Sequence, residues 1–322
     1  MKKVVSFALV IAMSFCLFAA GQNEDQYPSK AIELVVPAKA GGGTDINARV
    51  LATELQKEIG QSVAIVNIAG GAGTIAAAEV LDAPGDGYKA LYFHADLIIN
   101  TLMGMADYDW KDEFKIAGVV SRSFDYAVIV RADAPYNNVA ELVDYIKKTN
   151  TKPKYAMETG GIAHVLALAF QDEAGVAFNL VDVGGAADKI ANLLGGHVDI
   201  ITMPYGNVRD YVANGDFKVI GVMGGERSPF APNIPTFKEQ GLDIEHETFF
   251  FIAYNKKTPD SIVQYMSDAL GKVTATEEFK KGTENLQYSV SYMDSTTALE
   301  YMKDKEEGYK RYAEIALAAQ KK

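Results

Sequence analysis

The residues best suited to binding chemistry in this sequence are the backbone amides of a glycine loop. An apolar strand is predicted over residues 32–36, and it runs through Pro37 into three consecutive glycines at positions 41–43. A helix is predicted next, because Leu51, Leu55 and Ile59 recur at intervals of four residues. Glycines leave backbone N–H groups uncovered, and a helix N-terminus adds unsatisfied amides and a positive dipole end. Such a loop can hold an anion without lysine or arginine.

A plainer interpretation is a flexible strand-to-helix connection in which Thr44 or Asp45 only caps the helix. For Asp45 a contact to a polar group of a ligand is the alternative to the cap. The loop alone does not decide between these roles, so the elements around it have to.

Similar loops follow other predicted strands. The strand at 62–68 ends in a glycine-rich turn that contains Gly71, and the strand at 90–94 ends in His94 and Asp96. A second series begins with a helix at 139–148, and its glycines at 160–161 and 184–185 again stand between strands and helices. In open α/β sheets, ligands bind at the carboxyl ends of the strands. The pattern predicts an α/β protein made of two βαβ domains.

Competing chemistries have weaker support. The stretch Gly71-Ala72-Gly73-Thr74-Ile75-Ala76 matches the glycine fingerprint of dinucleotide-binding folds, but it follows the second strand rather than the first. An exported protein is also not expected to use a nicotinamide cofactor. The four histidines have no metal-ligand spacing, and no Gly-x-Ser-x-Gly elbow occurs. We therefore expect no catalytic residues, no metal and no cofactor.

The first residues look like an export signal. Lys2 and Lys3 precede an apolar stretch at 4–20 that ends in small residues, which predicts a signal peptide over residues 1–21 and an extracytoplasmic mature protein. Cys16 is an alternative lipid-attachment site, although the bulky Phe15 before it argues against this. The net charge of −11 disfavours nucleic acid as a partner, so an anionic ligand has to be captured locally.

Several stretches together resemble the extracytoplasmic solute receptors of tripartite tricarboxylate transporters, also called Bug-type receptors. The resemblance covers nearly the whole mature chain in order. The stretches are Tyr27-Pro28, Val36-Pro37 with Ala40-Gly41-Gly42-Gly43-Thr44-Asp45 and Ala48-Arg49, Gly60-Gln61-Ser62-Val63, residues 67–73, Asp86-Gly87-Tyr88, residues 160–164, residues 193–199, Arg227-Ser228 and residues 232–236. The sequence departs from the family at Asp182-Val183-Gly184-Gly185, where many members have Tyr-Lys-Gly-Gly.

The resemblance implies a two-domain, Venus-flytrap binding protein without catalytic activity, which delivers a small organic carboxylate to membrane transporter subunits. It further implies that backbone amides of the two glycine loops hold a ligand carboxylate. We expect domain 1 to comprise residues 27–130 and 250–322, domain 2 to comprise residues 131–249, hinges near 128–135 and 248–254, and a monomer. The expected ligand-binding residues are Ala40, Gly41, Gly42, Gly43, Thr44, Asp45, Gly71, His94, Asp96, Gly160, Gly161, Ile162, His164, Asp182, Gly184, Pro204 and Tyr205.

Two other functions stay open at this point. A secreted enzyme on the same scaffold would need a reactive group in the cleft, and His94, Asp96 and His164 are the candidates. A sensor would instead present its bound ligand to a signalling receptor. The sequence does not separate such a sensor from a transport receptor.

Overall fold

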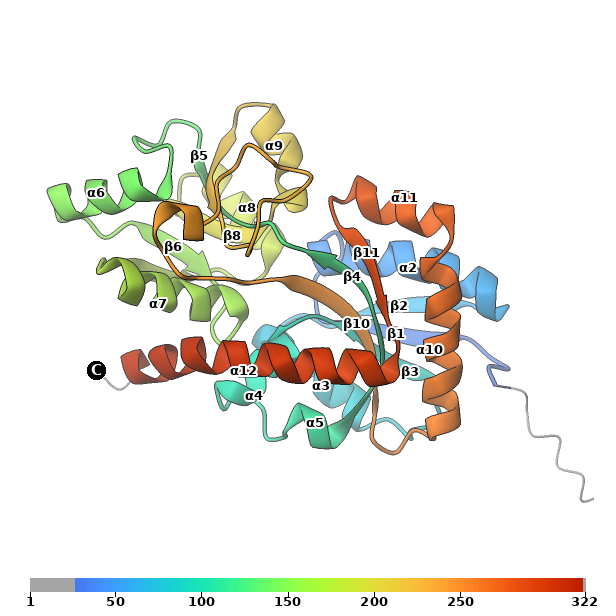
Figure 1. Ribbon diagram of the computed structural model, residues 1–322. Coiled ribbons are helices and arrows are strands. Elements are labelled where there is room, and N and C mark those ends of the chain that lie inside the picture. The colour runs from blue at the N-terminus through green and yellow to red at the C-terminus, as the bar shows by residue number, and fades with distance from the viewer. Residues whose placement is uncertain (1–26, 321–322) are drawn as a thin grey trace, which may run out of the picture.

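The computed structural model describes residues 27–320, so the predicted signal peptide and Cys16 lie outside the described part. The chain forms two lobes, each built around one sheet with helices packed on its faces (Figure 1). No helix within residues 27–320 is both long enough and apolar enough to cross a membrane.

The first lobe has a mixed sheet of six strands in the order β11-β4-β10-β3-β1-β2. Strands β1, β2 and β3 are parallel, whereas β10 runs antiparallel to both β3 and β4. Its strands are β1 (Ile32–Val36), β2 (Val63–Asn67), β3 (Lys89–Phe93), β4 (Phe114–Ser123), β10 (Thr248–Asn255) and β11 (Ser289–Met293). Its helices are α2 (Gly43–Ile59), α3 (Thr74–Leu81), α4 (Asp96–Leu102), α5 (Trp110–Glu113), α10 (Asp260–Thr274) and α11 (Glu277–Asn285), with a 3-10 turn at Gly71–Gly73.

Strand β10 shows how the sequence builds this lobe. All eight of its residues are buried, because helices cover both faces of the sheet. Side chains alternate along a strand, so Phe249 and Phe251 pack into one core while Phe250 and Ile252 pack into the other. The continuous aromatic run therefore fills two cores at once.

The second lobe has a sheet of five strands in the order β7-β6-β8-β5-β9, in which β6, β7 and β8 are parallel. Its strands are β5 (Tyr126–Arg131), β6 (Lys154–Met157), β7 (Asn179–Asp182), β8 (Ile200–Pro204) and β9 (Phe217–Val222). Its helices are α6 (Val139–Thr149), α7 (Ile162–Ala174), α8 (Ala186–Leu194) and α9 (Arg209–Ala213), with 3-10 turns at Tyr205–Asn207 and Lys238–Gln240.

The first crossing between the lobes differs from the boundary expected at residue 130. Strand β5 pairs with β8 and β9 of the second sheet, so the chain crosses between Ser123 and Tyr126. Asp125 fixes this crossing, since its buried carboxylate accepts hydrogen bonds from the hydroxyls of Ser123 and Ser228. The apolar run at 126–130 follows β4 almost directly in sequence, so the sequence favours placing it in domain 1. The pairing of β5 with β8 and β9 assigns it to the second lobe instead.

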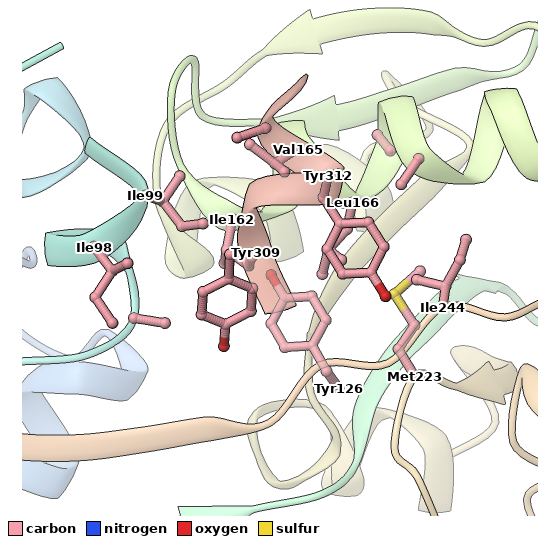
Figure 2. Packing of buried hydrophobic residues seen from close by; sticks show 14 of the residues in the cluster. Ile98, Ile99, Tyr126, Ile162, Val165, Leu166, Met223, Ile244, Tyr309 and Tyr312 are labelled. Carbon is pink, nitrogen blue, oxygen red and sulfur yellow. The ribbon is translucent and has the colours of Figure 1, made fainter. Parts of the chain in front are cut away.

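The long C-terminal helix α12 (Ser295–Gln320) packs on both lobes. It lies against β4 and α4 of the first lobe and α7 of the second, and in Figure 1 it crosses in front of the lower half of the molecule. Figure 2 shows Tyr309 and Tyr312 of this helix among Ile162, Leu166 and Tyr126 of the second lobe. The lobes therefore share one apolar core in addition to the two chain crossings, one between β4 and β5 and one between β9 and β10.

Candidate ligand-binding cleft

A cavity of about 340 Å³ lies between the lobes, at the carboxyl ends of the parallel strands. Loops after β1, β2 and β3 form one wall, and loops after β6, β7 and β8 form the opposite wall. Its lining includes Pro37, Ala38, Lys39, Gly42, Gly43, Thr44, Gly70, His94, Asp96, Tyr126, Glu158, Gly161, Ile162, Ala163, Gly184, Gly185, Ala186, Ala187, Asp188, Lys189, Thr202, Pro204, Asn207, His246, Thr248, Phe250 and Tyr288.

The N-terminus of α2 presents bare amides to this cavity. Gly42 is the N-cap and supplies no side-chain cap, and the first bond within the helix runs from Ile46 N–H to the Gly42 carbonyl at 3.0 Å. Within residues 27–320, the N–H groups of Gly43, Thr44 and Asp45 donate to no protein group. Because Gly43 and Thr44 line the cavity, this helix end is available to an anion.

Asp45 braces the glycine loop from behind. Its carboxylate accepts hydrogen bonds from Gly41 N–H at 2.8 Å, Arg49 Nε at 2.9 Å and Asn67 Nδ2 at 2.9 Å. Burial acts to raise the pKa of this carboxyl, but the hydrogen bonds outweigh it and hold the pKa below its usual value. Asp45 is therefore neither the N-cap of α2 nor part of the cavity lining, and it acts by holding the backbone of the loop in place.

Two helix N-termini of the second lobe face the same cavity. Helices α7 and α8 begin after Gly161 and Gly185, and neither glycine offers a side-chain cap. Lys189 lies in the first turns of α8, exposes only 7 % of its surface and lines the cavity. Within residues 27–320 its ammonium group makes no hydrogen bond and no salt bridge within 4.0 Å. The second wall thus adds a buried cation to its amides.

Two carboxylates reach across the cleft in opposite directions. Asp96 of the first lobe accepts a hydrogen bond from Ile162 N–H at 2.9 Å, and Glu158 of the second lobe accepts one from Ala72 N–H at 3.0 Å. An exposed ion pair between Lys39 and Asp188, 2.8 Å long, also joins the lobes at the rim. These contacts define a closed arrangement of the two lobes.

Burial shifts the titration of the groups in the cavity. It lowers the pKa of His94 to about 4 and that of His246 to about 3, so both imidazoles are neutral near pH 7. It raises the pKa of Asp96 to about 7, and burial together with the nearby Asp96 raises the pKa of Glu158. It lowers the pKa of Lys189, against the attraction of Glu158 and Asp96.

Aromatic rings close the inner end of the cavity. The rings of Phe250 and Tyr288 lie 5.4 Å apart between centroids, and those of Tyr126 and His246 lie 4.7 Å apart. This wall can pack against the apolar body of a ligand whose charged end faces the helix N-termini.

The structure brings together nine of the expected site residues in the cavity lining: Gly42, Gly43, Thr44, His94, Asp96, Gly161, Ile162, Gly184 and Pro204. The others lie outside it, namely Ala40, Gly41, Asp45, Gly71, Gly160, His164, Asp182 and Tyr205. Several of these support the loops instead. Asp182 accepts from Thr159 N–H and Gly184 N–H, and His164 Nδ1 accepts from Gly160 N–H at 3.3 Å.

Glu158 and Lys189 of the second wall line the cavity but were not among the residues expected from the sequence. A signal for Lys189 was present, because a lysine near the start of a helix opposes the helix dipole and needs a reason to be there. Tyr126 and Tyr288 carry no such signal, since Tyr126 begins an ordinary apolar strand and Tyr288 stands in a mixed polar stretch.

The glycine fingerprint at 71–76 has a packing explanation. Gly73 adopts φ +93°, and a Cβ at this position would lie 2.2 Å from the ring of Phe93. Glycine is therefore required there by conformation and space. Within the described residues, no three His, Cys, Asp or Glu side chains are grouped as they would be around a metal ion.

Two sheets, two strand crossings and a cavity between the lobes define a two-lobed solute-binding protein. Residues 47–316 match the family model described as the tripartite tricarboxylate transporter family receptor. Protein BugT of Bordetella pertussis is 28% identical over 272 residues, which are 81% of this chain and 82% of BugT.

Solved structures agree with the sequence match. A solute-binding protein of this family from Polaromonas is 31% identical, covers 89% of this chain and 98% of its own, and superposes with a TM-score of 0.67. The periplasmic binding protein BugD is 27% identical, covers 90% and 98%, and has a TM-score of 0.84. The chain belongs to the tripartite tricarboxylate transporter receptor family. It is a periplasmic solute-binding protein rather than an enzyme, which confirms the resemblance and the two-lobed fold predicted from the sequence.

Proposed function

We propose that this protein captures a small carboxylate between its lobes and delivers it to the membrane subunits of a tripartite tricarboxylate transporter. The observation that carries the proposal is the convergence of three helix N-termini, those of α2, α7 and α8, on one cavity that also holds Lys189. The N-cap glycines provide no side-chain cap, although the first amide of α7, Ile162 N–H, already donates to Asp96. Oriented amides and a buried ammonium group bind a carboxylate strongly, since both act in a site of low dielectric.

The ligand contacts in this proposal come from both lobes. We assign the amides of Gly43 and Thr44 on one wall and those of Ala163, Ala186 and Ala187 with Lys189 on the other. A ligand that touches both walls stabilises the closed arrangement, because its contacts with the second wall are lost when the lobes separate. Residues 1–21 act as the export signal and the mature protein acts as a monomer in this account.

The size of the cavity and the family fit this proposal. A volume of about 340 Å³ suits a ligand of metabolite size. Two further proteins of the same fold were solved with small dicarboxylates, MatC from Rhodopseudomonas palustris with malate and another R. palustris protein with adipate. At 21% and 23% identity they show that the fold accommodates ligands of this class.

Thermal unfolding with a library of small carboxylates tests the proposal. A ligand that binds only the native state raises the unfolding temperature by mass action. We expect at least one acid to raise it and the matching primary amide, which lacks the charge, to leave it unchanged. A library of mono-, di- and tricarboxylates and amino acids that gives no shift at saturating concentration would contradict the proposal.

A further inference from the structure

The cavity holds more ionisable groups than a simple carboxylate needs. Asp96 and Lys189 each expose only 7 % of their surface, and Glu158 is partly buried beside them. Within residues 27–320, no salt bridge within 4.0 Å joins Lys189 to either acid. Buried charges are usually paired, so these three groups are arranged for a partner that the protein does not supply.

Each acid has one oxygen in use and one to spare. Asp96 Oδ1 accepts from Ile162 N–H, and Glu158 Oε1 accepts from Ala72 N–H. The second oxygens, Asp96 Oδ2 and Glu158 Oε2, accept no hydrogen bond from any residue in the range 27–320, and both residues line the cavity. The protein thus positions two carboxylates from opposite lobes and leaves one oxygen of each available to the ligand.

Among residues 27–320, no other cation is placed to neutralise this pair. His94 lies nearest, with its Nδ1 3.8 Å from Asp96 Oδ1, but its lowered pKa keeps it neutral near pH 7. His246 is neutral for the same reason, and Lys39 at the rim is paired with Asp188. Asp182, the remaining acid near Lys189, adds negative charge rather than removing it. The titratable groups that interact with Asp96 and Glu158 are therefore one another, Lys189, the neutral His94, and the tyrosines Tyr126 and Tyr309, whose pKa values are raised by burial.

This distribution selects against a second carboxylate on the ligand at that place. A plain dicarboxylate that reached Asp96 and Glu158 would bring a third negative group into a site of low dielectric. A ligand amine would instead place a positive, hydrogen-donating group between two carboxylate oxygens that need donors.

We propose that the ligand is an amino carboxylate, whose carboxylate lies at the helix N-termini with Lys189 and whose ammonium group lies between Asp96 and Glu158. This inference rests on the proposed function and names its substrate class. Because one of the two acids comes from each lobe, the ammonium group would also bridge the lobes. It would do so beside the two hydrogen bonds that already cross the cleft.

Calorimetric titration with matched ligand pairs tests the inference. Each pair consists of an amino acid and the same acid without its amino group: aspartate with succinate, glutamate with glutarate, phenylalanine with 3-phenylpropionate. In at least one pair we expect the amino member to bind at least tenfold more tightly at about pH 8. We expect that ratio to fall at about pH 5, because protonated acids no longer attract the ammonium group.

Two variants locate the effect. Asp96→Asn and Glu158→Gln keep an oxygen that can accept the cross-lobe hydrogen bond but remove the negative charge. Each should bring the ratio within a pair close to one, because the amino member loses its charged partner and the acid without an amino group no longer meets a negative charge. Asp210→Asn, at an exposed position outside the cavity, is the matched control and should leave both affinities unchanged.

The outcomes separate the inference from the proposed function. If the acids without an amino group bind as tightly as their partners in every pair, the amino subsite is wrong and carboxylate binding stands. If the preference for amino ligands survives in both Asp96→Asn and Glu158→Gln, the assignment to these residues is wrong. If no member of any pair binds the folded protein, both the inference and the proposed function are contradicted.

Discussion

The N-termini of α2 and α8 show two ways of building an anion site from the same element. Both helices follow a strand and glycines, and both lack a side-chain cap. The α2 end presents amides alone, while Asp45 and Arg49 brace its loop from outside the cavity. The α8 end adds Lys189, which faces the cavity without a partner within residues 27–320. The α2 amides carry no titrating group, whereas Lys189 adds a positive charge to the α8 end, close to Glu158 and Asp96.

The largest effect is expected for Lys189→Met, which removes the charge that distinguishes the two helix ends. Affinity for the carboxylate ligand should fall by roughly 100-fold or more, about 3 kcal/mol, because a buried charge partner is lost. The unliganded variant should unfold at the same or a higher temperature, since an unpaired buried ammonium group costs stability. Titration calorimetry and thermal unfolding measure the two effects.

Lys39→Met is the control for this prediction. Lys39 also lines the cavity, but its side chain is 64% exposed and paired with Asp188. An exposed pair contributes about 0–1 kcal/mol, so the affinity should change by less than about fivefold. If Lys39→Met weakened binding as much as Lys189→Met, charge near the mouth of the cleft would matter more than the buried cation.

The second effect concerns Asp96, the acid that faces the second wall. Burial raises its pKa from 3.8 to about 7, so the native protein retains a proton that the unfolded chain releases between these values. The contribution of Asp96 to stability is therefore fully present below about pH 4 and is lost as the pH rises to about 7. Between about pH 5 and pH 7, wild type should lose about 2 kcal/mol of unfolding free energy relative to Asp96→Asn.

Urea unfolding of both proteins at the two pH values measures this difference. Comparison with the variant is needed because His94 and His246 act in the opposite sense. Their lowered pKa values contribute stability that is present above about pH 6.5 and lost as the pH falls. Parallel pH profiles for wild type and Asp96→Asn would show that Asp96 titrates normally in the native protein.

The smallest effect tests the amides at the α8 end. Ala186 is the first residue of the helix, and the extended backbone of Gly185 before it suits a following proline. Ala186→Pro removes one N–H that lines the cavity and should weaken binding about tenfold, the value of one hydrogen bond to a charged group. Glu277→Pro, at the same position of the exposed α11, removes an equivalent amide away from the cleft. Equal affinities of Ala186→Pro and wild type would remove the α8 amides from the site.

The glycine loop and most elements were predictable because their signals are local. Strand β10 followed from its unbroken apolar run, and α2 from its four-residue spacing after three glycines. Strand β11 was not predicted, since Ser289, Ser291 and Tyr292 interrupt its apolar residues and it depends on pairing with β4. The first lobe crossing was misplaced for the same reason, because strand pairing is a long-range property.

The polar and charged residues of the cavity were predictable only in part. His94, Asp96 and Gly161 were found because they end strands or begin helices. Glu158 follows β6 and Lys189 follows β7, so the two residues reach the same cavity because these strands pair, which no local pattern encodes. The role of Asp45 could not be predicted from residue spacing. Gly41 and Arg49 are near it in sequence, but its third partner, Asn67, lies at the end of β2.

The most direct test of the account is a titration of the purified protein with the best acid from the library and with its primary amide. The two ligands have nearly the same shape and differ in the charge that the helix ends and Lys189 are proposed to hold. We expect the acid to bind at least 100-fold more tightly than the amide. Equal affinities for the two would show that the cleft recognises something other than a carboxylate, and the account would be wrong.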